Sequence, residues 1–166
     1  GIGYGWNREE MFHHGVEFST RRERVRETML AVKQLWTEEE AEFHGEFIDF
    51  DPSWAWPKPV KEKGPRVMLG GAPGPTIFQH IAEFGNGWMP IGGSGIKASL
   101  SDLQKVCESK ERDFSEISII PFGTVPDQGK LDYFEELGVD EVILRVPAGP
   151  REHVLETLDS YVSFLK

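Results

Sequence analysis

Residues 65–73 have the sequence PRVMLGGAP, a short apolar run that ends at two adjacent glycines. A similar arrangement returns at residues 85–93, GNGWMPIGG. A buried parallel strand that stops at glycines delivers bare backbone to a ligand, because glycine allows a sharp turn and a close approach. We therefore expect two strand-to-helix turns, one after a strand at residues 67–69 and one after a strand at residues 88–91.

The same alternation continues to the end of the chain. Helical apolar spacing is expected at residues 76–84, at 96–107, around 131–137 and at 154–165, and further strands are expected at 117–122 and 141–147. Apolar strands separated by helical patterns indicate a parallel sheet covered by helices, and right-handed crossovers make consecutive strands neighbours. Residues 65–166 are thus predicted to form four βα units, which is the C-terminal half of a (β/α)8 TIM barrel.

Residues 1–64 are predicted to add a strand end, one long helix and a small insertion to the same partial-barrel domain, which covers residues 1–166. The glycine-rich start suits a turn, and a helix over residues 20–36 begins with a capping box from Thr20 to Glu23. A hairpin is expected over residues 43–50, turning at Gly45, and a proline-rich linker follows it. All strands of the barrel itself are expected to be parallel.

The charge balance excludes some classes of partner. The chain of 166 residues has 18 Lys and Arg against 28 Asp and Glu, a net charge of -10. Such a surface repels phosphate backbones and anionic lipids, so nucleic acid and membrane are not expected partners. Cys107 is the single cysteine, which rules out a disulfide framework and favours a reducing, cytoplasmic location.

The loop after the first strand is the candidate ligand site. In parallel α/β sheets, ligands bind beyond the carboxyl ends of the strands. Gly70, Gly71 and Ala72 occupy that position, and the next helix offers unpaired backbone N–H groups that suit a phosphate. The alternative is that the glycine pair only relieves a tight turn.

The next strand gives a less direct indication. Trp88 and Met89 alternate across the strand, so one of them is expected to face the core and the other to line a ligand cavity. If one interpretation is chosen for this segment, core packing is favoured.

Other residues with chemical potential are interpreted as structural. The five histidines form no pair at helical spacing and have no cysteine partner, so no metal site is predicted. His80 is expected to be a surface or edge residue of its helix, and Cys107 is expected in the core. The arginines of residues 21–26 alternate with Glu23 and Glu27, which predicts a solvated face of mutually paired charges.

Several motifs occur together in one order. They are residues 1–10 (GIGYGWNREE), Gly15, Phe18, residues 21–27, Leu35 and Trp36, residues 45–47 (GEF), residues 57–59 (PKP), Gly70 and Gly71, and residues 85–88 (GNGW). In this order the chain resembles the luciferase-like monooxygenases, strongly to about residue 93 and more loosely beyond. The resemblance implies an eight-stranded α/β barrel that binds either FMN or the deazaflavin coenzyme F-420, with coenzyme F-420 preferred.

The resemblance also implies roles for individual residues. The backbone of Gly70 and Gly71 would hold the cofactor phosphate, beside Ala72. Leu69, Trp88, Met89 and Pro90 would border the cofactor, and Asn7 would approach it from the neighbouring loop. The side chains of Tyr4 and Arg145 would line the cavity for a small-molecule substrate.

The same resemblance implies that an N-terminal half of the barrel is missing from this chain. That half supplies much of the substrate pocket, so no catalytic residue is assigned, and this chain alone is expected to anchor a cofactor without turning it over. We expect completion by the missing half or a homodimer. Two alternatives remain: a non-catalytic, self-associating barrel fragment, and a different barrel enzyme that binds a phosphate ligand.

Overall fold

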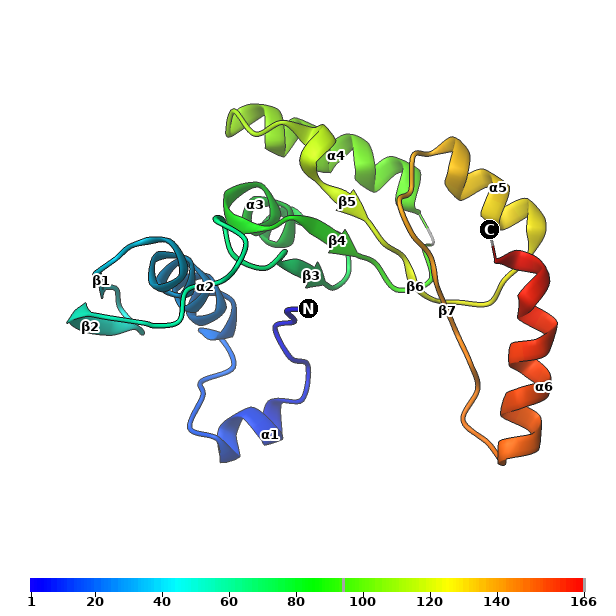
Figure 1. The fold of residues 1–166 in the computed structure, drawn as a ribbon, viewed down its shortest axis with the longest axis horizontal. Coiled ribbons are helices and arrows are strands. Elements are labelled where there is room, and N and C mark those ends of the chain that lie inside the picture. Colours follow the sequence, from blue (N-terminus) through cyan, green and yellow to red (C-terminus); the bar gives the residue numbers. More distant parts are fainter. Residues whose placement is uncertain (94, 166) are drawn as a thin grey trace.

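The computed structural model describes residues 1–93 and 95–165 and has an α/β architecture (Figure 1). Its helices are α1 Arg8–His13, α2 Arg21–Thr37, α3 Pro75–Phe84, α4 Ile96–Ser109, α5 Gln128–Glu136 and α6 Arg151–Tyr161, with short 3-10 helices at Phe114–Glu116 and Val162–Phe164. Its strands are β1 Ala41–His44, β2 Asp49–Ser53, β3 Met68–Gly70, β4 Gly87–Met89, β5 Ser118–Ile119, β6 Phe122–Thr124 and β7 Ile143–Leu144.

A parallel sheet forms the centre of the molecule. Strands β3, β4 and β5 pair in that order, and β6 pairs with β7, all in parallel. Isolated parallel bridges extend the series, from Ile2 to Leu69 at one edge and from Ile91 to Phe122 between the two groups. The predicted α/β class with parallel strands is confirmed, and the strand order follows the chain.

The strand expected at residues 117–122 is split in two. Pro121 separates β5 from β6, and a proline has no N–H to donate to a neighbouring strand. The backbone nevertheless stays in register, because Ile120 N–H donates to the Trp88 carbonyl at 2.9 Å and Phe122 N–H to the Pro90 carbonyl at 2.9 Å. β5 and β6 therefore act as one interrupted strand of the sheet.

Apolar side chains from the strands pack against the helices that cover them. The most completely buried are Leu69, Ile81, Phe84, Trp88, Ile96, Leu103, Cys107 and Phe134. Full burial of a large apolar side chain contributes about 1.5–3 kcal/mol, so this cluster is the main source of stability. Cys107 lies in the core, as predicted.

The insertion is the predicted hairpin. Strands β1 and β2 are antiparallel, with Phe43 opposite Phe50 and His44 opposite Asp49. The Lys58 ammonium, in the linker that follows, donates to the Leu35 carbonyl at 2.9 Å and also to the Glu38 carbonyl, at the end of α2. A lysine at this position satisfies carbonyls that a helix end leaves without partners.

The start of α2 differs from the prediction. Thr20 precedes the helix but caps none of its N–H groups, because its backbone already has helical angles (φ -89°, ψ -9°) whereas a capping residue needs an extended one. Its hydroxyl instead donates to the Glu17 carbonyl at 2.9 Å. The capping box predicted from Thr20 to Glu23 is wrong.

A short helix, α1, was not expected in the glycine-rich start. Asn7 precedes it, and the Asn7 Oδ1 atom accepts the Glu10 N–H at 3.2 Å. An Asn followed three residues later by Glu is a typical helix start, so the sequence did contain a signal for α1.

The predicted solvated face of α2 is wrong for Glu27, whereas the predicted pairing is confirmed for Arg26, whose Nη1 lies 2.8 Å from Glu23 Oε1. Glu27 is only 7% exposed, and its carboxylate accepts the N–H groups of Glu46 at 3.0 Å, Phe47 at 2.7 Å and Ile48 at 3.0 Å. Arg26 reaches from α2 to α3, where its Nε donates to Glu83 Oε2 at 2.7 Å. The two side chains therefore join α2 to the hairpin turn and to α3.

Across the described ranges 1–93 and 95–165, the model contains no helix with the length and apolar content that a membrane span requires.

The Glu27→Gln variant should lower the free energy of unfolding at pH 7 by roughly 1–3 kcal/mol, because an amide cannot accept all of these N–H donors. Burial raises the pKa of Glu27, but the three backbone donors outweigh it and hold the pKa below its ordinary value. This stabilisation is present above the unfolded-state pKa of about 4.3 and disappears as the pH falls through the lower folded-state pKa.

Urea unfolding of both proteins at pH 7 and at acidic pH would measure the difference. The exposed Glu62→Gln variant is the control and should unfold like the wild type. An equally stable Glu27→Gln variant would contradict the anchoring role of Glu27.

Candidate functional site

The loops that follow the parallel strands lie at one edge of the sheet. Ile2 pairs beside β3, and β3 pairs beside β4, so residues 3–7 lie next to the loop that joins β3 to α3. A pocket of about 260 Å³ opens between them. It is lined by Tyr4, Arg22 and residues 71–77.

The sheet uses the N–H groups of the glycine pair. Gly70 N–H donates to the Ile2 carbonyl at 2.8 Å, and Gly71 N–H donates to the Met89 carbonyl at 3.4 Å. The first free donors therefore come after Gly71. Pro73 and Pro75 have no N–H, so the other residues of this loop supply them. Within the described part of the chain, no acceptor faces the N–H groups of Ala72, Gly74, Thr76 and Ile77.

These free donors surround the start of α3. Pro75 is the first residue of the helix, and the Phe78 N–H already bonds to the Gly74 carbonyl at 3.2 Å. The N–H groups before it carry the positive end of the helix dipole. This end of α3 is therefore suited to an anion.

The residues predicted to border a cofactor are mostly beneath the loop. Trp88 is 1% exposed, packs edge-on against Phe78 at 5.4 Å between ring centroids, and donates from Nε1 to the Gly71 carbonyl at 3.0 Å. Leu69 and Pro90 are also buried, whereas Met89 is partly and Ala72 largely exposed. Trp88 faces the core, as favoured from the sequence, and supports the loop from below.

Arg22 adds a positive charge to this pocket. It lies on α2, and among the residues that the structure describes no carboxylate forms an ion pair with it. Its Cζ atom lies 5.7 Å from the centroid of the Tyr4 ring. The sequence prediction placed Arg22 in a paired, solvated face and so missed it, although its neighbours at three- and four-residue spacing include no acid.

Tyr4 joins this pocket to α3 through a buried histidine. The Tyr4 hydroxyl lies 2.8 Å from His80 Nδ1, and His80 is 5% exposed. The predicted surface position of His80 is therefore wrong, because α3 turns this side chain toward the N-terminal segment. Burial raises the pKa of Tyr4 to about 12 and lowers the pKa of His80, so both side chains are neutral at pH 7.

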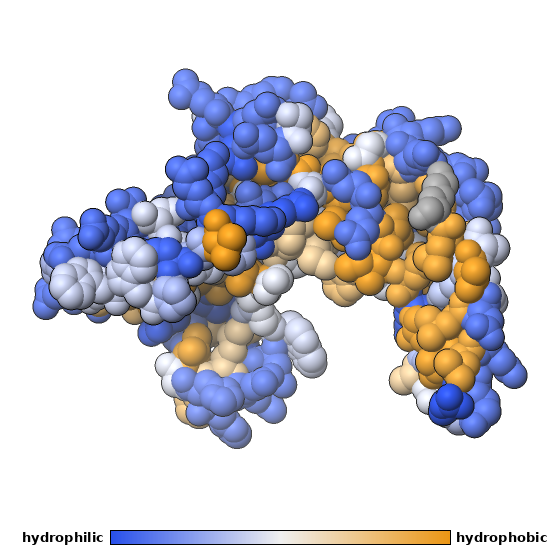
Figure 2. Space-filling view, in the orientation of Figure 1, coloured by the Kyte–Doolittle hydropathy of each residue, from blue (hydrophilic) through white to orange (hydrophobic). Residues whose placement is uncertain are grey.

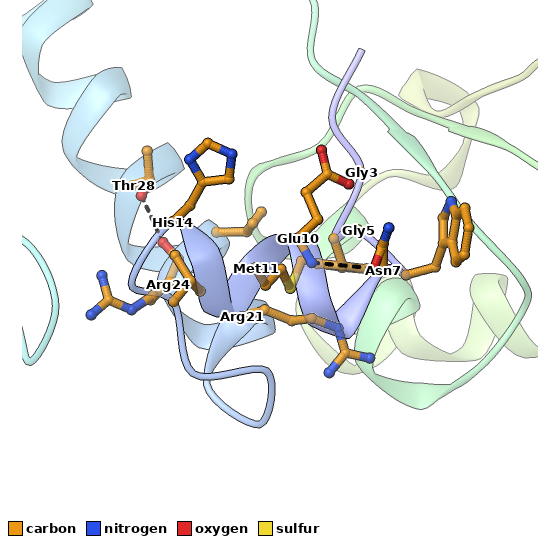
Figure 3. A pocket seen from close by; sticks show the side chains of 13 residues that line it. Gly3, Gly5, Asn7, Glu10, Met11, His14, Arg21, Arg24 and Thr28 are labelled. Carbon is orange, nitrogen blue, oxygen red and sulfur yellow. Dashed lines mark hydrogen bonds between the residues drawn. The ribbon is translucent and has the colours of Figure 1, made fainter.

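A larger pocket of about 540 Å³ is also lined by Tyr4 and lies between residues 3–7, α1 and α2 (Figure 3). Asn7 lines it, with its Oδ1 atom bonded to the Glu10 N–H. Arg145, the other predicted substrate residue, lines neither pocket; its carbonyl accepts the Tyr161 hydroxyl at 3.0 Å. Tyr4 thus lines both pockets, whereas Asn7 lines only the larger one, the loop after β3 lines only the smaller one, and Arg145 lines neither.

Comparison with known proteins places this chain in a family. The family model for luciferase-like monooxygenases matches residues 1–126. The chain belongs to this family. The luciferase-like chain is 40% identical over 149 residues to an uncharacterized protein of Mycobacterium tuberculosis, an alignment that covers 89% of this chain and 52% of that protein. The chain therefore spans about half the length of this relative.

More distant relatives have named activities. An FMNH(2)-dependent dimethylsulfone monooxygenase of Pseudomonas putida is 29% identical over 106 residues, which is 60% of this chain and 29% of that protein. A coenzyme F-420-dependent glucose-6-phosphate dehydrogenase of Kineococcus radiotolerans is 32% identical over 85 residues, which is 49% of this chain and 24% of that protein.

Solved structures share the fold at low identity. A monooxygenase from Streptomyces bottropensis superposes with a TM-score of 0.76 at 16% identity, covering 98% of this chain and 66% of that one. A coenzyme F-420-dependent secondary alcohol dehydrogenase gives a TM-score of 0.74 at 12% identity, covering 99% and 68%. These likenesses show the fold of luciferase-like enzymes.

The Trp88→Phe variant tests the support under the loop. It keeps the aromatic packing but removes the indole donor to the Gly71 carbonyl, a loss of about 1 kcal/mol. We expect amide hydrogen exchange at Gly71 and Phe78, whose N–H groups bond to the Met89 and Gly74 carbonyls, to become about fivefold faster. The Trp54→Phe variant, which removes an exposed indole bond to Glu40 in the hairpin, should leave this exchange unchanged, and unchanged exchange in Trp88→Phe would refute the role of the indole.

Proposed function

We propose that the intact protein is a flavin- or deazaflavin-dependent oxidoreductase or monooxygenase, and that this chain supplies the pocket for the cofactor phosphate. One observation supports this most directly. The Arg22 guanidinium and the free N–H groups at the start of α3 line the same pocket, in a chain of the luciferase-like family.

The donor set fits a phosphate group. Phosphate oxygens accept hydrogen bonds from backbone N–H groups at a helix start, and an arginine adds charge-assisted bonds. The pocket also has room, because a Cβ atom built on Gly74 would meet nothing within 4 Å. In place of the predicted Gly70 and Gly71 donors, the proposed donors are the N–H groups of Ala72, Gly74, Thr76 and Ile77.

The chemistry of the reaction is assigned to the cofactor, which supplies hydride transfer when bound. The residues of this chain bind and orient it. Trp88 holds the loop, the α3 donors and Arg22 hold the phosphate, and Tyr4 lines both the phosphate pocket and the larger pocket beside Asn7. We place the rest of the cofactor and a small-molecule substrate on the Asn7 side.

Coenzyme F-420 is the preferred cofactor and FMN the alternative. The preference rests on residues 5–7 (GWN), Trp36, Gly45 and residues 57–59 (PKP). Relatives are named as dependent on either coenzyme F-420 or FMNH(2). The lone, buried Cys107 supports a cytoplasmic location.

We also propose that the chain is one part of a barrel that is completed by further strands or by a second copy. Figure 2 shows apolar residues on the lower side of the molecule, below the centre of the view, and along α6. The exposed apolar residues at this end are Ile143, Val146, Leu155, Leu158, Val162 and Leu165. Exposed apolar surface of this kind favours a covering partner, and gel filtration of the 166-residue chain would show whether it self-associates.

Gly74→Asp should weaken binding of the cofactor to the intact protein by at least tenfold, because the new carboxylate would lie among the phosphate donors and repel the phosphate. Gly74 has an extended backbone (φ 167°) that any residue can adopt. Gly74→Asn has the same shape without the charge and is the matched control, with a smaller expected loss. Fluorescence titration with coenzyme F-420 and with FMN measures both dissociation constants.

Two results would contradict the proposal. If the wild-type intact protein binds neither coenzyme F-420 nor FMN, the proposed function is wrong. If Gly74→Asp binds as tightly as Gly74→Asn, the phosphate does not lie at the start of α3.

A further inference from the structure

Tyr4 and His80 lie directly behind the cation of the anion pocket. Tyr4 belongs to the N-terminal segment, His80 to α3 and Arg22 to α2. We propose that Tyr4 and His80 are positioning residues for Arg22: the hydrogen bond to His80 fixes the Tyr4 ring, and the ring holds the guanidinium toward residues 71–77. This role rests on the proposed function in one respect, that the pocket binds an anion.

The Tyr4 ring is fixed at both of its ends. On the backbone side, Ile2 pairs with Leu69, its N–H donating to the Met68 carbonyl at 2.7 Å. On the hydroxyl side, His80 Nδ1 lies 2.8 Å away. His80 is itself fixed, since it is buried and its ring packs 5.5 Å from that of Phe84, one turn further along α3.

Arg22 has no other fixed partner. The neighbouring Arg26 is bound to both Glu23 and Glu83, whereas no carboxylate among residues 1–93 and 95–165 pairs with Arg22. Its contact with the Tyr4 ring, at 5.7 Å, is within the range of a cation–π interaction. A cation that is already oriented loses less conformational freedom when a ligand binds, which increases affinity by about three- to tenfold.

The surroundings of Tyr4 and His80 keep both side chains neutral, so that they support Arg22 and do not act as proton donors. The groups that face His80 are Tyr4 from the N-terminal segment, Arg22, Glu23 and Arg26 from α2, and Glu83 from α3 itself. Burial keeps the imidazole neutral and raises the pKa of the Tyr4 hydroxyl. At pH 7 the pair is therefore a neutral hydrogen bond whose effect is geometric.

The test is a set of dissociation constants for the intact protein, measured by calorimetry with coenzyme F-420, with FMN and with inorganic pyrophosphate. Tyr4→Phe keeps the ring but frees it, and His80→Leu removes the hydrogen-bond partner of the Tyr4 hydroxyl; each should weaken binding about three- to tenfold. His80→Asn retains a hydrogen-bonding group near the position of Nδ1 and should restore most of the affinity. Tyr161→Phe removes a tyrosine hydroxyl bonded elsewhere, to the Arg145 carbonyl, and is the matched control without effect.

A merely structural role is distinguished by repeating Tyr4→Phe in an Arg22→Gln background. If Tyr4 acts through Arg22, the second substitution weakens binding no further. The same fractional loss in both backgrounds, or wild-type affinity in Tyr4→Phe, would overturn the proposal. Because Tyr4→Phe is a mild change, this comparison holds even if His80→Leu fails to fold.

The pyrophosphate arm separates this proposal from the proposed function. If the protein binds pyrophosphate but neither cofactor, the proposed function is wrong. The comparison of Tyr4→Phe in the wild-type and Arg22→Gln backgrounds would then still decide the role of Tyr4 and His80. Binding of none of the three ligands would mean that the pocket is not an anion site, which overturns both.

Discussion

The pairing of β3 on both of its edges is the constraint on which the site depends. Ile2 lies along one edge and β4 along the other, and this double pairing uses the N–H groups of Gly70 and Gly71. The backbone donors that remain free are therefore those of the next turn, at the start of α3. The same pairing places Tyr4 beside α3, so that residues 76 positions apart in the chain share a hydrogen bond.

The charged residues of α2 show how tertiary contacts divide one sequence pattern into separate roles. Glu27 is buried and binds the hairpin turn, and Arg26 joins α2 to α3 through Glu83. Arg24 lies over the Phe47 ring of the hairpin. Arg22 alone among these residues lines the pocket at the start of α3. Successive arginines point in different directions around the helix, so adjacent residues meet different neighbours.

Much of the ordered pattern that indicates the family has a structural explanation. A Cβ atom on Gly45 would lie 2.4 Å from the Glu27 carboxylate, and one on Gly87 would lie 2.6 Å from the Ser118 carbonyl. Lys58 satisfies carbonyls at the end of α2. These positions preserve the packing of the fold, whereas the proposed anion pocket uses backbone N–H groups and one arginine, which have no distinctive sequence.

The sequence by itself determined the alternation of strands and helices, the parallel sheet, the hairpin and the position of the loop after β3. These features depend on hydrophobic periodicity, glycines and prolines, which act over a few residues. The tertiary structure alone decided which N–H groups stay free, that His80 is buried against Tyr4, and that Arg22 rather than Arg26 faces the pocket. Those outcomes depend on which distant segments pack together, and the local pattern of the chain does not contain that information.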